Sequence, residues 1–387
     1  MTLHSGFNEG AILQAYSLSA TLNAMPDTEA EIVNIRYPEK SRVYGPPDND
    51  RKKALDHAAR EWLPTSPEEF ADGHSPEYYR YLESRYDRLI TGSDVVWTLR
   101  YQGRFRRFFK NGIFPRQCDP FFPAFPNAYW LPHCDNCTRV AYGASIGSFD
   151  WQGAPRRDVA AMGESLARFR AIGVRDDRTM DFVQKVCPDF AGTLQQTADP
   201  TFLIEDPFSE HHASATGKLE AAGIRSGDGG TVVFICNSDA KLGALGERFR
   251  AAGWQVVELT APCGAGGIDL TKHDISPAEW TRIIASADLV VTERMHATIF
   301  SIRNHTPFVV IDPYERVPGE ATKVTSLLKL FKLGAFRIAK IQADAKSIWP
   351  LVEAATATDA FDWESVDRRL AEVQESGRQF LRDSLSV

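Results

Sequence analysis

An arginine and a histidine lie two positions apart in the segment TERMHATIFS, residues 292–301. The apolar run 288–292 is typical of a buried strand, and the apolar spacing from 295 to 302 predicts a helix that packs one face on a sheet. Arg294 and His296 fall off that face, close to the first turn of the helix. A helix N-terminus carries partial positive charge, so an unpaired cation there costs roughly a few tenths to one kcal/mol.

A bound anion would make this cluster favourable. The free N–H groups of a first helical turn bind anions, arginine donates two parallel hydrogen bonds to a carboxylate or phosphate, and histidine can deliver a proton. We therefore predict an anion site at Arg294 and His296. The alternative is that Arg294 pairs with Glu293 and that His296 is an ordinary structural side chain.

Other polar side chains follow predicted strands, which is where open α/β sheets bind their ligands. Arg175 follows the predicted strand 171–174, and Asp176 or Asp177 is typical of a helix cap. Asp94 lies in GSDVVW, directly after another predicted strand. Its carboxylate either caps the next segment or acts as a general acid or base in the cleft.

Two further segments have compositions that could serve a substrate. The turn TAPCGAGG, residues 260–267, is rich in glycine but matches no complete phosphate-loop motif, so we interpret it as an ordinary loop. Residues 98–137 are dense in aromatic residues and proline, as in FPRQCDPFFPAFPNAYWLP. Packing onto the first domain is the commoner reason for such a composition, and stacking on a sugar ring is the alternative.

The elements that must position these residues alternate between β-rich runs and helical patterns, which predicts an α/β fold with parallel sheets. The predicted strands are 32–35, 88–91, 139–144, 171–174, 231–236, 255–259, 288–292 and 308–311. We divide the chain into an N-terminal domain (1–200), a C-terminal domain (201–360) and a closing helix (361–387). The segment MTLHSGFNEGAILQAYSL predicts a strand, a turn and a helix, with a strand that is either short or begins upstream of Met1.

Composition excludes several classes of protein. The 387 residues include 43% hydrophobic and 25% charged residues, as in globular proteins. A net charge of −7 disfavours nucleic-acid binding, and no apolar run approaches the ~20 residues that span a bilayer. We expect a cytoplasmic protein without a transmembrane segment; association with a membrane surface and the oligomeric state stay open. Only Cys134 and Cys137 form a CxxC, so we expect free thiols and no metal.

Taken in order, several segments resemble the polysaccharide pyruvyl transferase family. They are NEGAILQAYSL, YDRLITGSDVVW, RVAYGASIGS, GVRDDRT, ADPTFL and DLVVTERMHATIFSIRNHTPFVVID, and TKVTSLLKLFKL is similar to the family's lysine-containing segment. The resemblance implies two Rossmann-like domains that face a cleft, as in GT-B glycosyltransferases. It also implies phosphoenolpyruvate as donor, a pair of sugar hydroxyls on a glycan as acceptor, and no cofactor.

The resemblance further implies roles for single residues. The donor-binding residues would be Arg175, Arg294, Met295 and His296, with Met295 acting through its backbone. The residues of the acceptor cleft would be Asn8, Gly10, Ser93, Asp94 and Trp97. We expect His296 to protonate the donor and Asp94 to accept the proton of the attacking hydroxyl. The rival hypothesis is a GT-B-like glycosyltransferase that uses a nucleotide sugar, for which Glu293 would be the nearby acidic group.

Overall fold

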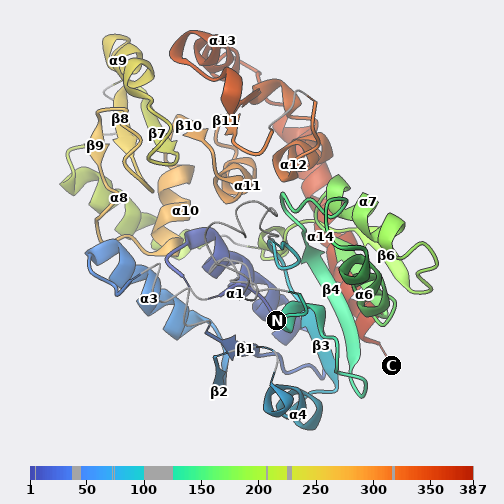
Figure 1. The fold of residues 1–387 in the computed structure, drawn as a ribbon. Helices are drawn as coiled ribbons and strands as arrows, with labels where there is room; N and C mark the ends of the chain where they lie inside the picture. The colour runs from blue at the N-terminus through green and yellow to red at the C-terminus, as the bar shows by residue number, and fades with distance from the viewer. Residues whose placement is uncertain are drawn as a thin grey trace, which may run out of the picture.

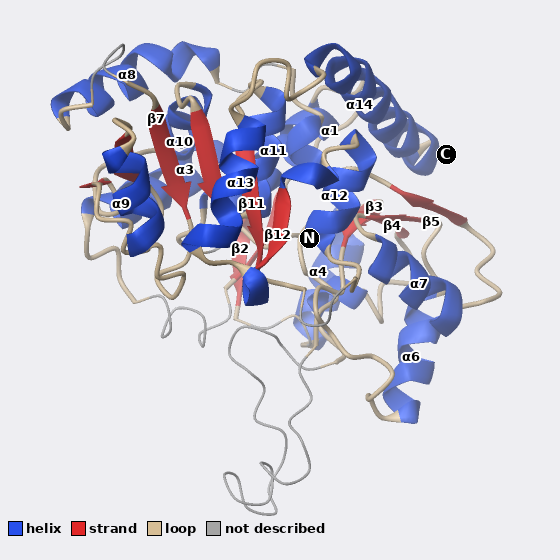
Figure 2. Ribbon diagram, turned by 90° about the horizontal axis from the view of Figure 1, so that it is seen from above, coloured by secondary structure: helices blue, strands red, loops and turns tan. Residues whose placement is uncertain are grey.

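The computed structural model (Figure 1) describes the chain apart from residues 5, 37–44, 72, 74, 100–124, 206–207, 225–228, 316–318 and 387. Within the described ranges, the strands form one two-stranded, one four-stranded and one six-stranded sheet, and the strands pair in parallel. Helices pack around the sheets (Figure 2). The α/β class predicted from the alternating patterns is confirmed.

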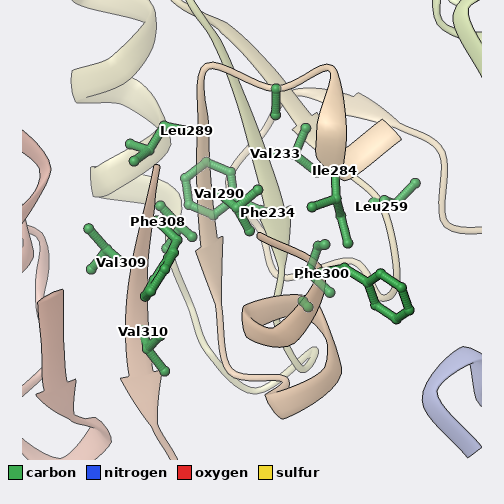
Figure 3. Packing of buried hydrophobic residues seen from close by; sticks show 14 of the residues in the cluster. Val233, Phe234, Leu259, Ile284, Leu289, Val290, Phe300, Phe308, Val309 and Val310 are labelled. Carbon is green, nitrogen blue, oxygen red and sulfur yellow. The ribbon is translucent and has the colours of Figure 1, made fainter. Parts of the chain in front are cut away.

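The six-stranded sheet lies in the C-terminal half of the chain. Its strands are β7 (Thr231–Ile235), β8 (Gln255–Glu258), β9 (Ile268–Asp269), β10 (Leu289–Thr292), β11 (Phe308–Asp312) and β12 (Arg337–Ala339). They follow the order β12-β11-β10-β7-β8-β9, so the chain reverses its direction across the sheet between β7 and β10. Both faces are covered, and residues such as Val233, Phe234, Val290 and Phe308 pack into one core (Figure 3).

The N-terminal half contains the other two sheets. The four-stranded sheet consists of β3 (Arg88–Thr91), β4 (Thr138–Ala144), β5 (Ala171–Val174) and β6 (Thr193–Gln196), and the two-stranded sheet of β1 (Ile32–Ile35) and β2 (Thr65–Phe70). Residues 1–4 lie beside β3: the Met1 amino group donates to the Ile90 carbonyl at 2.8 Å, and the Gly92 N–H donates to the Met1 carbonyl at 2.6 Å. This segment, predicted as a strand, follows the edge of β3 but does not continue as a regular strand.

Helices connect the strands and cover the sheets. The α-helices are α1 (Glu9–Asn23), α3 (Asp50–Trp62), α4 (Pro76–Arg85), α6 (Arg156–Leu166), α7 (Asp177–Val186), α8 (His212–Ala221), α9 (Gly243–Ala251), α10 (Pro277–Ala285), α11 (Met295–Arg303), α12 (Lys323–Phe331), α13 (Ala345–Ala355) and α14 (Trp363–Leu385). Short 3-10 helices are η1 (Ala128–Trp130), η2 (Pro200–Phe202), η3 (Ser209–His211), η4 (Gly334–Phe336) and η5 (Lys340–Gln342). None of the described helices is both long and apolar enough to cross a bilayer.

The last helix joins the two halves of the molecule. α14 contacts α12, which lies beside the six-stranded sheet, and β4 in the four-stranded sheet (Figure 1). Gly377 allows α14 to pack closely on β4, since a Cβ atom there would lie 2.5 Å from the Tyr142 hydroxyl. The closing helix predicted at 361–387 corresponds to α14, Trp363–Leu385. The domain boundary near residue 200 stays a prediction, because α14 returns from one half to the other.

Candidate active site

The candidate site lies at the carboxyl end of β10, beside β7, where the strand order reverses. The Thr292 hydroxyl donates to the Ile235 carbonyl on β7 at 2.9 Å and accepts a hydrogen bond from the Arg294 N–H at 2.8 Å. α11 begins directly afterwards at Met295, and no side chain caps it. The first N–H groups of α11 can therefore serve an anion.

A pocket opens at the start of α11, which lies between the two halves of the molecule (Figure 1). Its lining residues are Asn8, Glu9, Gly10, Asp94, Thr260, Trp280, Arg294, Met295, His296, Tyr314 and Lys323. Asn8, Gly10, Asp94, Arg294, Met295 and His296, all predicted from the sequence as site residues, thus meet in one pocket. The lining residues that were not predicted as site residues are Glu9, Thr260, Trp280, Tyr314 and Lys323.

Arg294 supplies a positive charge to the pocket. Among the described residues its guanidinium has no hydrogen-bond or ion-pair partner, and its Nε is buried. Glu293, the alternative partner, is engaged elsewhere: its carboxylate accepts from the Asn237 N–H at 2.8 Å and lies 2.9 Å from Lys340 Nζ. The predicted alternative of an Arg294–Glu293 pair is therefore wrong. A buried donor without an acceptor is costly, so Arg294 is suited to an anionic ligand.

His296 is held between the two halves. On one side, a Cβ atom on Gly10 would lie only 2.1 Å from His296 Nδ1, so the absence of a side chain at Gly10 makes this approach feasible. On the other side, Nε2 lies 3.6 Å from Asp199 Oδ2, an ion-pair distance that is too long for a hydrogen bond. The side chain keeps 14% of its surface exposed, so the imidazole is accessible from the pocket.

A second helix N-terminus adds another cation. Lys323 is the first residue of α12, which Thr322 caps, and its Nζ lies 4.5 Å above the ring of Tyr314. The one acidic residue on the α1 side of the pocket, Glu9, accepts a hydrogen bond from Arg51 Nε at 3.0 Å and is thereby neutralised. The pocket thus combines Arg294, Lys323 and His296 with two helix starts, which favours a small ligand with several negative charges.

Arg175, which the resemblance implies as a donor-binding residue, is buried. Its side chain is 1% exposed, and it donates to Asp199 at 2.8 Å, to Asp94 at 3.2 Å and to the Ser93 hydroxyl at 3.5 Å. Burial would lower the pKa of Arg175, but the charges of Asp94 and Asp199 raise it above its ordinary value. In this structure its guanidinium binds carboxylates of the chain and does not line the pocket that contains Arg294.

Asp94 lines the pocket from the side of the four-stranded sheet. Its backbone pairs with Ala144 and has a φ of 77°, which aspartate tolerates better than most residues. Burial would raise the pKa of its carboxyl, but Arg175, Lys323 and His296 outweigh burial and hold that pKa below the ordinary value. Asp94 is therefore ionised at neutral pH. Its side chain binds Arg175, in contrast to the alternative in which it caps the next segment.

The structure places Trp97 and Ser93 outside the pocket. Trp97 is fully buried, stacks on Trp130 with ring centroids 5.4 Å apart, and donates to the Tyr129 carbonyl at 3.1 Å. The predicted role of Trp97 in the acceptor cleft is therefore wrong, because no face of its ring is open to a sugar. Ser93 is also buried and donates to Asp199 at 3.2 Å. Within the segment 98–137, residues 100–124 lie outside the described residues, and the aromatic residues near Trp130 pack in the core.

The glycine-rich turn at 260–267 does bind an anion, but one that belongs to the chain. The Glu258 carboxylate accepts hydrogen bonds from the N–H groups of Cys263 at 2.7 Å, Gly264 at 3.3 Å and Gly266 at 2.8 Å. The prediction of an ordinary loop is confirmed, since these donors are already used.

Cys134 and Cys137 are buried and form no disulfide. Burial raises the pKa of Cys134 to about 12, which disfavours the thiolate that a metal ligand or redox site needs.

Comparisons with known proteins identify the family and the fold of the chain. The family model described as polysaccharide pyruvyl transferase matches residues 8–314. No curated protein matches the chain in sequence.

Similar solved structures include a UDP-N-acetylglucosamine 2-epimerase (9% identity, TM-score 0.55, 98% of this chain and 93% of that chain covered). Others are the N-terminal domain of Candida albicans trehalose-6-phosphate phosphatase (12%, 0.54, 100% and 95%) and S. aureus MnaA with UDP (8%, 0.53, 95% and 94%). At these identities the likeness concerns the fold alone, which is GT-B-like, with two Rossmann-like halves.

Proposed function

The chain belongs to the polysaccharide pyruvyl transferase family, and from this premise we propose that it transfers the pyruvate group of phosphoenolpyruvate onto two hydroxyls of a glycan sugar. The product is a pyruvate ketal, and phosphate is released. The observation that carries the proposal is the Arg294 guanidinium, which lies at an uncapped helix start without a counter-ion among the described residues. A donor with one carboxylate and one phosphate supplies the missing negative charge.

The donor would bind across the starts of α11 and α12. Arg294 would pair with one anionic group, Lys323 with another, and the N–H groups that begin at Met295 would complete the site. Lys323 joins the donor residues predicted from the sequence. Arg175 would contribute through Asp94, whose carboxylate it holds.

His296 would act as the general acid. In its protonated form it transfers its proton to the methylene carbon, the electron pair of the C=C bond forms the new C–H bond, and C2 becomes electron-poor. A sugar hydroxyl oxygen attacks C2, and the proton of that hydroxyl passes through Asp94 to the departing phosphate. The C2–O bond to phosphate then breaks with its electron pair, the second hydroxyl closes the ketal, and its proton restores His296. No cofactor enters this scheme.

The low pKa of Asp94 limits what this carboxylate can do. It accepts a hydrogen bond from an approaching hydroxyl and orients it, but it is a weak base towards a free alcohol. Proton transfer to Asp94 would therefore accompany formation of the C–O bond, when the hydroxyl becomes acidic. The rival hypothesis of a nucleotide-sugar transferase loses its candidate acidic group, because Glu293 is buried outside the pocket and pairs with Lys340.

Calorimetry with phosphoenolpyruvate tests the donor. We expect binding to the wild-type protein and a loss of about tenfold to a hundredfold in affinity for Arg294→Ala, because a charge-assisted hydrogen bond contributes about 1.5–3 kcal/mol. Arg60→Ala on the exposed face of α3 serves as the control and should bind normally. Unchanged affinity in Arg294→Ala would contradict the proposed donor site, and binding of UDP-sugars in place of phosphoenolpyruvate would favour the rival hypothesis.

A further inference from the structure

Asp199 is a fully buried carboxylate that touches His296 and that the scheme above does not use. It follows β6 and begins η2 (Pro200–Phe202), which contacts both α1 and α11. The motif ADPTFL therefore delivers a carboxylate to the place where the two halves meet. A charge in such a position needs partners, since an isolated buried carboxylate is very costly.

The two oxygens of Asp199 have different partners. Oδ1 accepts from the Thr201 N–H at 3.0 Å and from the Thr201 hydroxyl at 2.7 Å, so the turn itself holds this oxygen. Oδ2 accepts from Arg175 at 2.8 Å and from Ser93 at 3.2 Å, and it lies 3.6 Å from His296 Nε2. The carboxylate is thus fixed through one oxygen and turned towards the histidine with the other.

The imidazole complements this arrangement. His296 Nε2 is buried and has no hydrogen-bond partner among the described residues, and the carboxylate of Asp199 lies 3.6 Å from it. Nδ1, the other ring nitrogen, lies against Gly10, which lines the pocket. A small movement of the ring towards Asp199 would form the hydrogen bond at Nε2 and leave Nδ1 directed at the pocket.

We propose that Asp199 is the positioning residue for His296: it holds the Nε2 edge of the imidazole, favours the protonated ring, and leaves Nδ1 to deliver the proton. The delivery step rests on the proposed function, whereas the pairing itself does not. The same arrangement, in which a buried carboxylate orients a histidine through one ring nitrogen, serves proton transfer in other enzymes.

The charges around the pair are consistent with this role. Burial would raise the pKa of Asp199, but His296, Arg175 and Thr201 hold it well below the ordinary value, so the carboxylate keeps its charge at neutral pH. Asp94 is the second carboxylate whose charge acts on His296, although Arg175 binds its side chain. Arg294 and Lys323 line the same pocket as the ring and add positive charge there. Asp199 is the carboxylate that lies at contact distance from the ring.

The first test uses the ligand-free protein and does not depend on turnover. The ring nitrogens of ¹⁵N-labelled histidine report the fraction of doubly protonated imidazole at a fixed pH near neutrality, and the spectrum of His296→Gln assigns the signal. Asp199→Asn should lower the ratio of protonated to neutral His296 by about tenfold, because an opposite charge within ~4–6 Å favours the charged form by one unit of pH or more. Arg175 keeps Asp94 as a counter-ion in this variant.

Thr201→Val is the matched control. It removes the 2.7 Å hydrogen bond to Asp199 and perturbs the same buried turn, but it keeps the carboxylate charge. The protonated fraction of His296 should stay within about twofold of wild type. Equal changes in both variants, or no change in Asp199→Asn, would overturn the proposal.

If Asp199→Asn does not fold, wild-type protein labelled with ¹³C at the aspartate carboxyls decides the same question. The Asp199 signal must then shift over the pH range in which His296 titrates, and a flat signal overturns the pairing.

Kinetics then separates positioning from binding. With phosphoenolpyruvate and an accepting glycan, Asp199→Asn should lower kcat by about a hundredfold and leave the KM for phosphoenolpyruvate within about threefold, because the loss falls on general acid catalysis. A raised KM with unchanged kcat would contradict the proposed role. If wild-type protein neither binds phosphoenolpyruvate nor releases phosphate, the proposed function fails, while the NMR result still decides the pairing of Asp199 with His296.

Discussion

At the scale of single residues, the site combines cations that line the pocket with a histidine that has a carboxylate beside it. The Arg294 guanidinium has no carboxylate partner among the described residues, whereas His296 lies 3.6 Å from Asp199. Lys323 lies over the ring of Tyr314, and its charge acts on Asp94. Arg175, by contrast, already binds two carboxylates. In the proposed function, Arg294 and Lys323 accordingly bind the anionic donor and His296 transfers the proton.

Substitution of His296 tests its role as the acid. His296→Ala should keep phosphoenolpyruvate binding within about tenfold of wild type, because Arg294 and the helix starts remain. Phosphate release with an accepting glycan should fall by about a hundredfold or more, the usual contribution of a general acid. A colorimetric phosphate assay measures the change, with His273→Ala on an exposed loop as the control. Normal turnover in His296→Ala would remove His296 as the acid.

At the scale of elements, the strand ends and helix starts decide which side chains meet. β10 ends at Thr292, whose hydroxyl ties the turn to β7, so α11 begins at the reversal point of the strand order. α12 begins after β11 and brings Lys323 to the same place. Because each helix starts at the carboxyl edge of the sheet, both positive helix ends face one pocket.

The packing of α14 on β4 can be tested by a substitution at Gly377. Gly377→Ala should destabilise the protein by about 1–3 kcal/mol, because the new methyl group would collide with Tyr142 and lever α14 away from β4. The matched control is Gly217→Ala in α8, where nothing lies within 4 Å of the new Cβ. The free energy of unfolding of that variant should rise by about 0.5–1 kcal/mol, which is the difference in helix propensity between glycine and alanine. Chemical denaturation measures both changes, and the same sign in both would contradict this packing argument.

At the scale of the whole molecule, the pocket exists only when both halves are folded and adjoin. Asn8, Gly10 and Asp94 come from the first half, and Arg294 and Lys323 from the second. The contact between α7 and α12 helps to hold them together, since the Asp177 N–H donates to the Ser326 hydroxyl at 3.2 Å. An unfolded chain therefore has no site for the donor.

Phosphoenolpyruvate should consequently stabilise the folded protein. A ligand that binds only the folded state adds about 2.7 kcal/mol at a concentration one hundred times its Kd, which corresponds to a rise of about 3 °C in Tm for a chain of this length. Differential scanning calorimetry measures the shift. Arg294→Ala, compared at the same ligand concentration, should show a clearly smaller rise. An equal rise in that variant would place the ligand elsewhere.

Most of the strands that the sequence predicts correctly are buried, and β3 is the half-buried exception. The predicted ranges of β7, β8, β10 and β11 agree with the structure to within one residue, because strands covered on both faces are continuous apolar runs. β2 was missed, since TSPEEF contains a proline and two glutamates and is mostly exposed. β9 and β12 are short edge strands of two and three residues, too short for a pattern to stand out.

The sequence by itself determined the α/β class, the strand and helix that frame Arg294 and His296, and the positive charge of that turn, because these follow from local periodicity and from the partial charge of a helix start. Only the tertiary structure decided which side chains share a space. It buried Arg175 and Trp97, brought Lys323 into the pocket, and set Asp199 against His296. These contacts join segments that are separated in the sequence by other strands and helices, and no local pattern records the distance between such segments in a folded chain.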